Sequence, residues 1–231
     1  TRFKCDWSSD VCSSDLARML ARFAATNCPT PMRKPELVRL QIRDLVRTRR
    51  QFIAMRVSLE HQHALTDPLI ADVFQQTLET VTRQIATLTE RIDVLVASSQ
   101  SAARAREIFL SVPGIGETTA AMLVAEMPEL GTCSNKQIAS LLGVAPMTQQ
   151  SGNAKPTAHI RNGRREVRSA LWMPVLSMQR YNPAVRALAV RLRSKGKPGK
   201  SIATACMRKL ITILNTMITK DEEWDPIRIY A

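Results

Sequence analysis

Hydrophobic residues recur at helical spacing along most of the chain, so the predicted fold class is mainly α. In residues 36–64 they follow one face of a single long helix, at Val38, Ile42, Leu45, Phe52 and Leu59. In residues 74–95 they alternate in steps of four and three, which is a heptad pattern, at Phe74, Leu78, Val81, Ile85, Leu88, Ile92 and Leu95.

Only a short turn separates these two helical segments. It contains Thr66, Asp67 and Pro68, and proline suits the first position of a helix. Residues 36–104 are therefore predicted to form a long antiparallel coiled-coil hairpin. We expect a homo-oligomer through this coiled coil, and an intramolecular hairpin alone is the other interpretation.

A glycine-containing turn follows, with the sequence VPGIG at residues 112–116. Glycine tolerates positive φ and adds no side chain, so Gly114 and Gly116 favour a tight turn whose N–H groups face a phosphate. Glu117 and Thr118 then begin a helix, whose free N–H groups face the same turn. We interpret this as a helix-hairpin-helix that binds nucleic-acid backbone through Gly114, Ile115, Gly116 and Thr118. A plain helical corner is the alternative.

Positive charge favours the nucleic-acid interpretation. The chain has a net charge of +13, and residues 155–209 hold fourteen basic residues against one acid, Glu166. Such a segment predicts a polyanionic partner and binding that weakens with salt. The predicted contacts are Arg161, Arg164, Arg165, Arg168, Lys197, Lys200, Arg208 and Lys209.

A capped helix and an irregular segment lie between the turn and the basic stretch. Ser134 and Gln137 have the spacing of a capping box, and the helix is expected to end at Gly143. Residues 147–159 are polar and are predicted to be irregular, with Ser151 before a glycine. The Ser151 hydroxyl suits a nucleophile that attacks a phosphate held by the arginines, although a loop serine is more often a turn residue.

Other features narrow the class of protein. No apolar run reaches the length needed to span a bilayer, and no secretory signal is recognisable, so no membrane association is expected. Five cysteines occur without Cys-x-x-Cys spacing, which favours reduced thiols in the cytoplasm. No residues are assigned to a metal.

The first sixteen residues look like an artefact. The run DWSSDVCSSDL at residues 6–16 is what a common short-read sequencing adapter encodes when it is translated in frame. We therefore expect natural sequence to resume at about Ala17 and draw no functional conclusion from residues 1–16.

Several separated blocks together resemble one family. They are FLSVPGIGETTAAMLVAEMPELG, SNKQIASLLGVAP, QQSG, IRNGRREVRSALWM, QRYNP and GKPGKSIATACMRKLITILN. In order and spacing they are similar to the C-terminal region of transposases of the insertion-sequence 110 family, the 116/110/902 group. The resemblance spans about Ala17 to Pro226.

The resemblance implies a layout and a chemistry. Family members have an N-terminal RuvC-like domain with metal-binding acids, a coiled-coil hairpin and a C-terminal domain with a nucleophilic serine. They are thought to join DNA through a phosphoserine, with Mg²⁺ and a structured guide RNA. On this basis residues 17–35 are a remnant of the RuvC-like domain, residues 105–231 are the C-terminal transposase domain, and Ser151 is the catalytic residue.

The chain also departs from the family pattern. Leu16 stands where the family has an aspartate of the metal site, so none of the metal-binding acids is expected in this chain. Pro156 and Asn162 replace usual glycines, and Pro174 interrupts a helix. We therefore predict a DNA-binding fragment of a transposase that is inactive alone, or else a non-catalytic nucleic-acid-binding and oligomerisation module.

Overall fold

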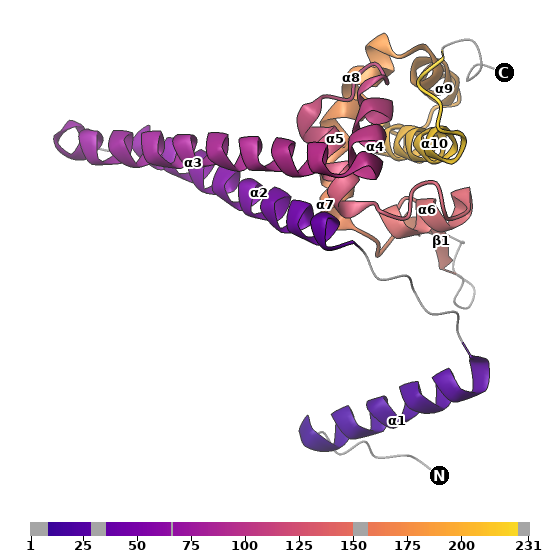
Figure 1. The fold of residues 1–231 in the computed structure, drawn as a ribbon. Coiled ribbons are helices and arrows are strands. Elements are labelled where there is room, and N and C mark those ends of the chain that lie inside the picture. The colour runs from indigo at the N-terminus through magenta and orange to yellow at the C-terminus, as the bar shows by residue number, and fades with distance from the viewer. Residues whose placement is uncertain (1–8, 29–35, 66, 150–156, 226–231) are drawn as a thin grey trace. The chain divides into compact units, whose positions relative to one another are not determined.

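The computed structural model describes residues 9–28, 36–65, 67–149 and 157–225 (Figure 1). These fall into two compact units that divide between Pro35 and Glu36. The first contains one helix, α1 (Ser9–Asn27), which begins within the adapter-like segment. Its apolar residues Leu16, Met19, Leu20 and Phe23 are all more than half exposed.

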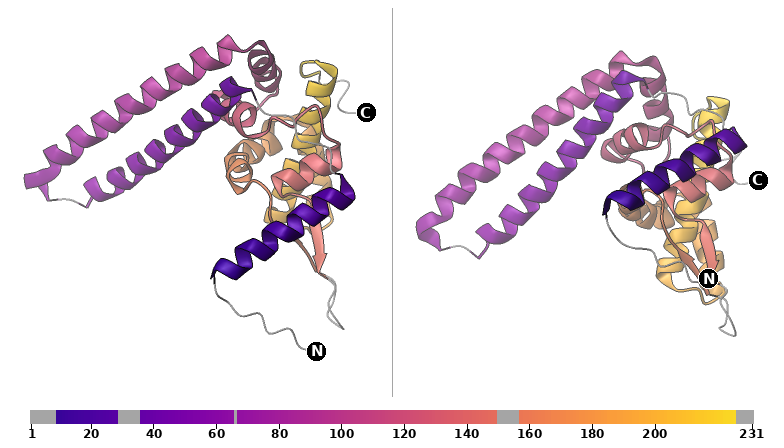
Figure 2. Two further views of the ribbon diagram at one scale, coloured as in Figure 1. Left: turned by 60° about the horizontal axis from the view of Figure 1, so that its bottom comes forward. Right: turned by 90° about the horizontal axis from the view of Figure 1, so that it is seen from below.

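The second unit begins with the predicted pair of long helices, α2 (Leu37–His63) and α3 (Ala71–Ser98). Asp67 accepts a hydrogen bond from the Leu69 N–H and caps a short 3-10 helix, η1 (Pro68–Ile70), in the turn. The two helices pack along each other and project from the rest of the unit in all views (Figures 1 and 2). Val81, Ile85, Leu88 and Ile92 are buried, which confirms the predicted apolar face of α3.

Most of the remaining residues form a helical domain with a two-stranded hairpin. The helices are α4 (Gln100–Leu110), α5 (Glu117–Glu126), α6 (Asn135–Leu142), α7 (Arg165–Ala170), α8 (Trp172–Tyr181), α9 (Pro183–Ser194) and α10 (Gly199–Lys220). The boundary predicted at residue 105 thus falls inside α4. Mainly α is the observed class.

The core of this domain surrounds α5 and α10. Eight consecutive residues of α5, Thr119 to Glu126, are buried, so this helix is apolar on all sides, as expected for a central helix. α10 packs against α4, α6, α8 and α9. Core side chains of α2 and α3, including Ile42 and Ile92, belong to the same apolar cluster. The helix pair is therefore continuous with the core.

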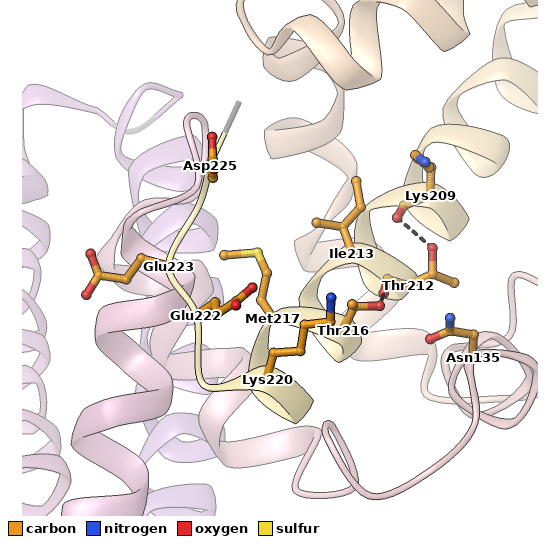
Figure 3. Close-up of a pocket in the computed structure, with 10 residues that line it drawn as sticks. All are labelled: Asn135, Lys209, Thr212, Ile213, Thr216, Met217, Lys220, Glu222, Glu223 and Asp225. Carbon is orange, nitrogen blue, oxygen red and sulfur yellow. Dashed lines mark hydrogen bonds between the residues drawn. The ribbon is translucent and has the colours of Figure 1, made fainter. Parts of the chain in front are cut away.

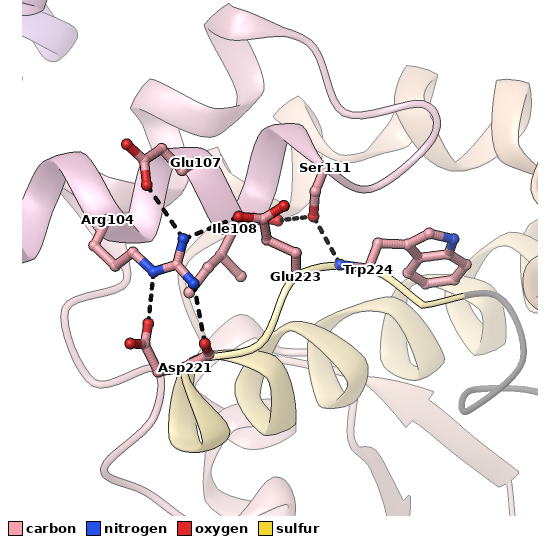
Figure 4. Close-up of polar contacts among 7 residues, drawn as sticks. All are labelled: Arg104, Glu107, Ile108, Ser111, Asp221, Glu223 and Trp224. Atoms are coloured by element: carbon pink, nitrogen blue, oxygen red, sulfur yellow. Dashed lines mark hydrogen bonds and ion pairs between the residues drawn. The ribbon is translucent and has the colours of Figure 1, made fainter.

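Polar contacts join α10, and the segment after it, to neighbouring parts of the domain. The buried Asn215 of α10 accepts a hydrogen bond from Gly131 N–H (2.8 Å) and donates to the Cys133 carbonyl (3.0 Å). Arg104 of α4 contacts the carboxylates of Glu107, Asp221 and Glu223, as Figure 4 shows. The backbone N–H of Trp224 donates to the Ser111 hydroxyl (2.9 Å). The segment after α10 is thereby held against α4.

Two sequence-based expectations for the middle of the domain have different outcomes. The capping box of Ser134 and Gln137 is present, and Gly143 ends α6 with φ of 78°. Residues 147–159 are not wholly irregular, because β1 (Pro146–Gln149) pairs antiparallel with β2 (Thr157–Ile160). Four-residue strands are too short for a clear alternating pattern.

Pro174, which departs from the family pattern, lies in the first turn of a new helix. Leu171 ends α7 and precedes α8, so Pro174 is the third residue of α8. A proline in the first turn of a helix removes no helical hydrogen bond.

Among the described residues, no helix is both long and apolar enough to cross a membrane.

Candidate nucleic-acid interface

The VPGIG turn joins α4 to α5. Val112 and Ile115 are buried, and the Ile115 N–H donates to the Val112 carbonyl (3.0 Å). Gly114 has φ of 102°, as predicted. The prediction of positive φ for Gly116 is wrong: it has φ of −99° and ψ of 173° and is the N-cap of α5. Extended backbone is the usual conformation of an N-cap.

The turn presents unsatisfied donors at the surface. Gly114, Gly116, Glu117 and Thr118 are exposed, and their backbone N–H groups donate to no atom of the described residues. Glu117 and Thr118 open α5, so the positive end of the helix dipole lies at the same place. Ile115 is only 6% exposed, and its side chain anchors the turn in the core. An anion is the ligand that this set of donors fits.

Side chains around the turn offset the one carboxylate there. Arg106 of α4 contacts Glu117 (2.6 Å) and also Asp93 of α3 (2.8 Å). Arg49 of α2 donates to the Thr118 hydroxyl (3.4 Å). The charge of Glu117 is thereby paired beside the free N–H groups.

Asn182 fixes the turn from the other side, and sequence reasoning missed it. It is fully buried, donates to the Pro113 carbonyl (3.3 Å) and accepts from the Val185 N–H (3.3 Å) as the N-cap of α9. The available signal was Asn182 directly before Pro183, a typical start of a helix. Its contact with Pro113 is long-range and has no such signal.

Arg164, a predicted nucleic-acid contact, is directed into the protein. Its guanidinium donates to both carboxylate oxygens of Glu129 (2.6 and 2.5 Å) and to the Glu126 carbonyl (2.5 Å). The Glu126 carboxylate in turn accepts two hydrogen bonds from Arg47 of α2 (2.6 and 2.9 Å). These contacts connect α2, the end of α5 and the start of α7.

Arg168 is also occupied within the protein. Its Nη1 donates to the carbonyls of Leu142 (3.2 Å), Gly143 (3.4 Å) and Asn162 (3.0 Å). The two ends of the segment that holds β1 and β2 meet there, because the backbones of Gly143 and Gly163 are in contact, a feature we call the glycine contact. Asn162 has φ of 60°, which asparagine tolerates better than most residues, so replacement of the family's glycine is accommodated.

Other predicted contacts lie at the surface. Arg161 and Arg165 are exposed, as are Lys197, Lys200, Arg208 and Lys209. Lys209 lies in different surroundings from the others. It lines a pocket of about 320 Å³ with Lys220 and three carboxylates, those of Glu222, Glu223 and Asp225 (Figure 3). Lys209 thus shares its surroundings with carboxylates, one of which, Glu223, is already paired with Arg104.

Ser151 lies outside the described residues, and its role stays a prediction. The antiparallel register pairs Gln149 with Thr157, so residues 150–156 connect the far ends of β1 and β2. The near ends are joined at the glycine contact. The structure thus defines both ends of the segment that contains Ser151.

The pair of Glu129 and Arg164 predicts a pH-dependent stability. Burial is the largest single influence and acts to raise the pKa of Glu129, but the hydrogen bonds from Arg164, a backbone hydrogen bond and the charge of the guanidinium together outweigh burial and hold this pKa below its usual value. A lowered folded-state pKa stabilises the protein above the unfolded pKa of about 4.3, and this stabilisation is lost as the pH falls through the folded pKa. We expect a contribution on the order of 1 kcal/mol.

Urea unfolding between pH 7 and pH 3 measures this contribution. Glu129→Gln should lower the free energy of unfolding at pH 7. At pH 3 the free energies of unfolding of this variant and the unsubstituted chain should differ less. Glu90→Gln, at an exposed position with no ion pair among the described residues, is the control. Equal pH profiles for all three proteins would contradict the assignment.

Comparison with known proteins identifies relatives of this region. Residues 106–189 match the family described as Transposase IS116/IS110/IS902 family. A pilin gene-inverting protein of Moraxella bovis is 29% identical over 218 residues, which are 90% of this chain and 66% of that protein. A protein of the same name from Moraxella lacunata is 37% identical over 123 residues, 51% of this chain and 38% of that protein.

A third relative comes from an insertion element. The insertion element IS110 uncharacterized 43.6 kDa protein of Streptomyces coelicolor is 30% identical over 114 residues, 48% of this chain and 28% of that protein. The chain therefore spans no more than 66% of the length of these three relatives.

Proposed function

Residues 106–189 form a domain of the IS116/IS110/IS902 transposase family, and from this premise we propose that the chain is the nucleic-acid-binding part of a DNA recombinase. Two relatives are named for gene inversion. Inverting a DNA segment requires strands to be cut and rejoined, so such a protein must hold DNA backbone. A structured guide RNA, implied by the family resemblance, would present the same phosphates.

The free N–H groups at the VPGIG turn carry this proposal. Gly114, Gly116, Glu117 and Thr118 present four backbone donors without a protein partner among the described residues. Backbone donors bind phosphate oxygens without reading sequence. The basic segment 155–209 adds exposed positive side chains to the same domain, of which Arg165, Lys197 and Lys200 are examples.

Substitution of Gly116 tests the turn without disturbing its fold. A side chain there would meet no atom within 4 Å, whereas one at Gly114 would lie 2.6 Å from Cγ of the buried Met178. Gly116→Leu should cover the donors and weaken binding to a duplex about tenfold, because charge-assisted hydrogen bonds contribute about 1.5–3 kcal/mol each. Gly116→Ser is the matched control, since serine is small and suits an N-cap.

Fluorescence anisotropy with a labelled duplex at several salt concentrations measures both effects. The logarithm of affinity should fall with the logarithm of salt at a slope of several units, one unit for about each phosphate contact. Gly116→Leu should reduce the magnitude of this slope. Binding without salt dependence, or equal affinity of the leucine and serine variants, would contradict the proposed interface.

We further propose Ser151 as the nucleophile of the intact protein. Its oxygen would replace a deoxyribose oxygen on phosphorus, which cuts the strand and attaches it to the protein, while the released oxygen takes up a proton. The family resemblance and the position of Ser151 between β1 and β2 support this proposal. A non-catalytic binding module remains the alternative, and it predicts no covalent step.

The family resemblance also implies Mg²⁺. Within the described ranges, no group of three or more His, Cys, Asp or Glu side chains is arranged to hold a metal ion. The described residues of this chain do not fit such a site, so we assign Mg²⁺ to none of them and derive no step through it.

A further inference from the structure

We infer that a cavity beside the end of β2 binds an unpaired nucleobase, an inference that rests on the proposed function. The cavity has a volume of about 360 Å³ and is lined by Ile160, Arg168, Ser169, Trp172, Thr204 and Met207. These residues come from β2, α7, α8 and the first half of α10. The volume lies within the range of about 300–1,000 Å³ that is typical of small-molecule sites.

The chemistry of the lining matches a nucleobase. Trp172 is half-buried, and its indole packs against the core on one side and lines the cavity on another. The indole N–H of Trp172 and the Ser169 hydroxyl make no hydrogen bond within the part of the chain that the structure describes. An aromatic side chain beside polar groups that have no protein partner is the combination that stacks and orients single bases.

Positive charge near the cavity favours a base that is attached to a phosphate backbone. Lys200 and Arg208 lie four residues before and after Thr204 on α10, so all three share one face of the helix. Both cations are exposed and form no ion pair among the described residues. The lining contains no carboxylate, and the nearby Glu166 is paired with Arg50 (2.7 Å). The pocket at Lys209 differs, because carboxylates line it (Figure 3).

The position of the cavity relates it to the proposed nucleophile. Ile160 is the last residue of β2 and pairs with Pro146, at the end of the hairpin away from residues 150–156. Three residues of strand, about 10 Å, separate Ile160 from Thr157 at the other end. A base held in the cavity must leave its duplex, as in other enzymes that act on bases or strands outside the stack.

Tryptophan fluorescence tests this binding directly. With Trp7→Phe and Trp224→Phe, Trp172 is the only tryptophan left. Titration with the deoxyadenosine trinucleotide should quench its emission, because the base stacks on the indole. The adenosine trinucleotide forms the second arm, and a difference between the two arms identifies DNA or RNA as the source of the base.

Variants in the otherwise unsubstituted chain separate this inference from the proposed function. Trp172→Ala should lower single-strand affinity at least about fivefold, the smallest loss expected for one stacked base, and leave duplex affinity unchanged. Ser169→Leu fills the cavity from an exposed position without removing core packing and should have the same effect. Met173→Ala, at the adjacent exposed residue outside the lining, is the control.

The outcomes are distinct. Quenching together with a selective single-strand loss in Ser169→Leu supports the cavity, even if Trp172→Ala fails to fold. If the unsubstituted chain binds duplex, but Ser169→Leu and Met173→Ala bind single strands as tightly as the unsubstituted chain does, the inference about the cavity is overturned and the proposed function is not. If the unsubstituted chain shows no salt-dependent duplex binding, the proposed function is overturned, and this inference with it.

Discussion

Gly163→Ala is expected to destabilise the protein by about 2–5 kcal/mol, because two costs act at one atom. Gly163 has φ of 71°, where an L-residue is disfavoured by roughly 1–2 kcal/mol. A Cβ would also lie 2.5 Å from the Gly143 Cα and 2.7 Å from the Leu142 carbonyl carbon. Backbone atoms cannot move aside as a flexible side chain does, and overpacking of this kind costs about 1–3 kcal/mol.

Gly196→Ala is the matched control for this prediction. Gly196 has φ of 66°, but a Cβ there would meet no atom within 4 Å. It should therefore show only the conformational cost of roughly 1–2 kcal/mol. Urea unfolding followed by circular dichroism measures the stability of both variants. An equal loss of stability in the two would show that the glycine contact is not tight.

Ile92→Asp is expected to cost about 3–5 kcal/mol and to unfold the α2–α3 pair. Ile92 is 2% exposed and belongs to the apolar cluster that contains Ile42 and Val46 of α2. The substitution removes buried apolar volume and places a carboxylate without a partner in the same space. Reduced helicity and a lower urea midpoint are the expected observations.

Val94→Asp controls for helix propensity and charge on the same helix. Val94 is 69% exposed, two residues from Ile92 on α3, and its replacement should change stability by less than about 0.5 kcal/mol. Light scattering of the same samples tests the predicted homo-oligomer. If Ile92→Asp leaves circular dichroism, unfolding and mass unchanged, the apolar face of α3 has been misinterpreted.

Features governed by local sequence could be predicted. The apolar spacing predicted α2 and α3, because one buried face requires a period near 3.6 residues. The capping box at Ser134 and the end of α6 at Gly143 depend on neighbouring residues alone. Pro68 at the start of η1 is another case, since proline fixes its own φ.

Features that depend on distant partners could not be predicted. Arg164 and Arg165 are adjacent in a basic run, yet the first binds Glu129 and the second is exposed. Nothing in the sequence distinguishes them, because the partner of Arg164 is 35 residues away. The same holds for Arg168, whose acceptors are backbone carbonyls brought together by the glycine contact.

This distinction changes how the basic run is interpreted. Charge counting assigns all four arginines from Arg161 to Arg168 to nucleic acid. The structure gives Arg164 and Arg168 internal partners at the base of the hairpin that leads to residues 150–156. These two side chains therefore stabilise the base of that hairpin. The exposed Arg165 is the better residue to substitute in a test of contact with nucleic-acid backbone.

Covalent capture of DNA tests the central claim, that this chain is part of a recombinase, most directly. The chain, extended by the N-terminal domain that the family resemblance implies, is incubated with Mg²⁺, the structured guide RNA that the resemblance also implies and labelled DNA. The products are then analysed on a denaturing gel. We predict a protein–DNA adduct that Ser151→Ala abolishes while duplex affinity stays within about twofold, since one hydroxyl adds little to many phosphate contacts. An adduct that persists in Ser151→Ala, or no adduct in the unsubstituted protein, would contradict the account.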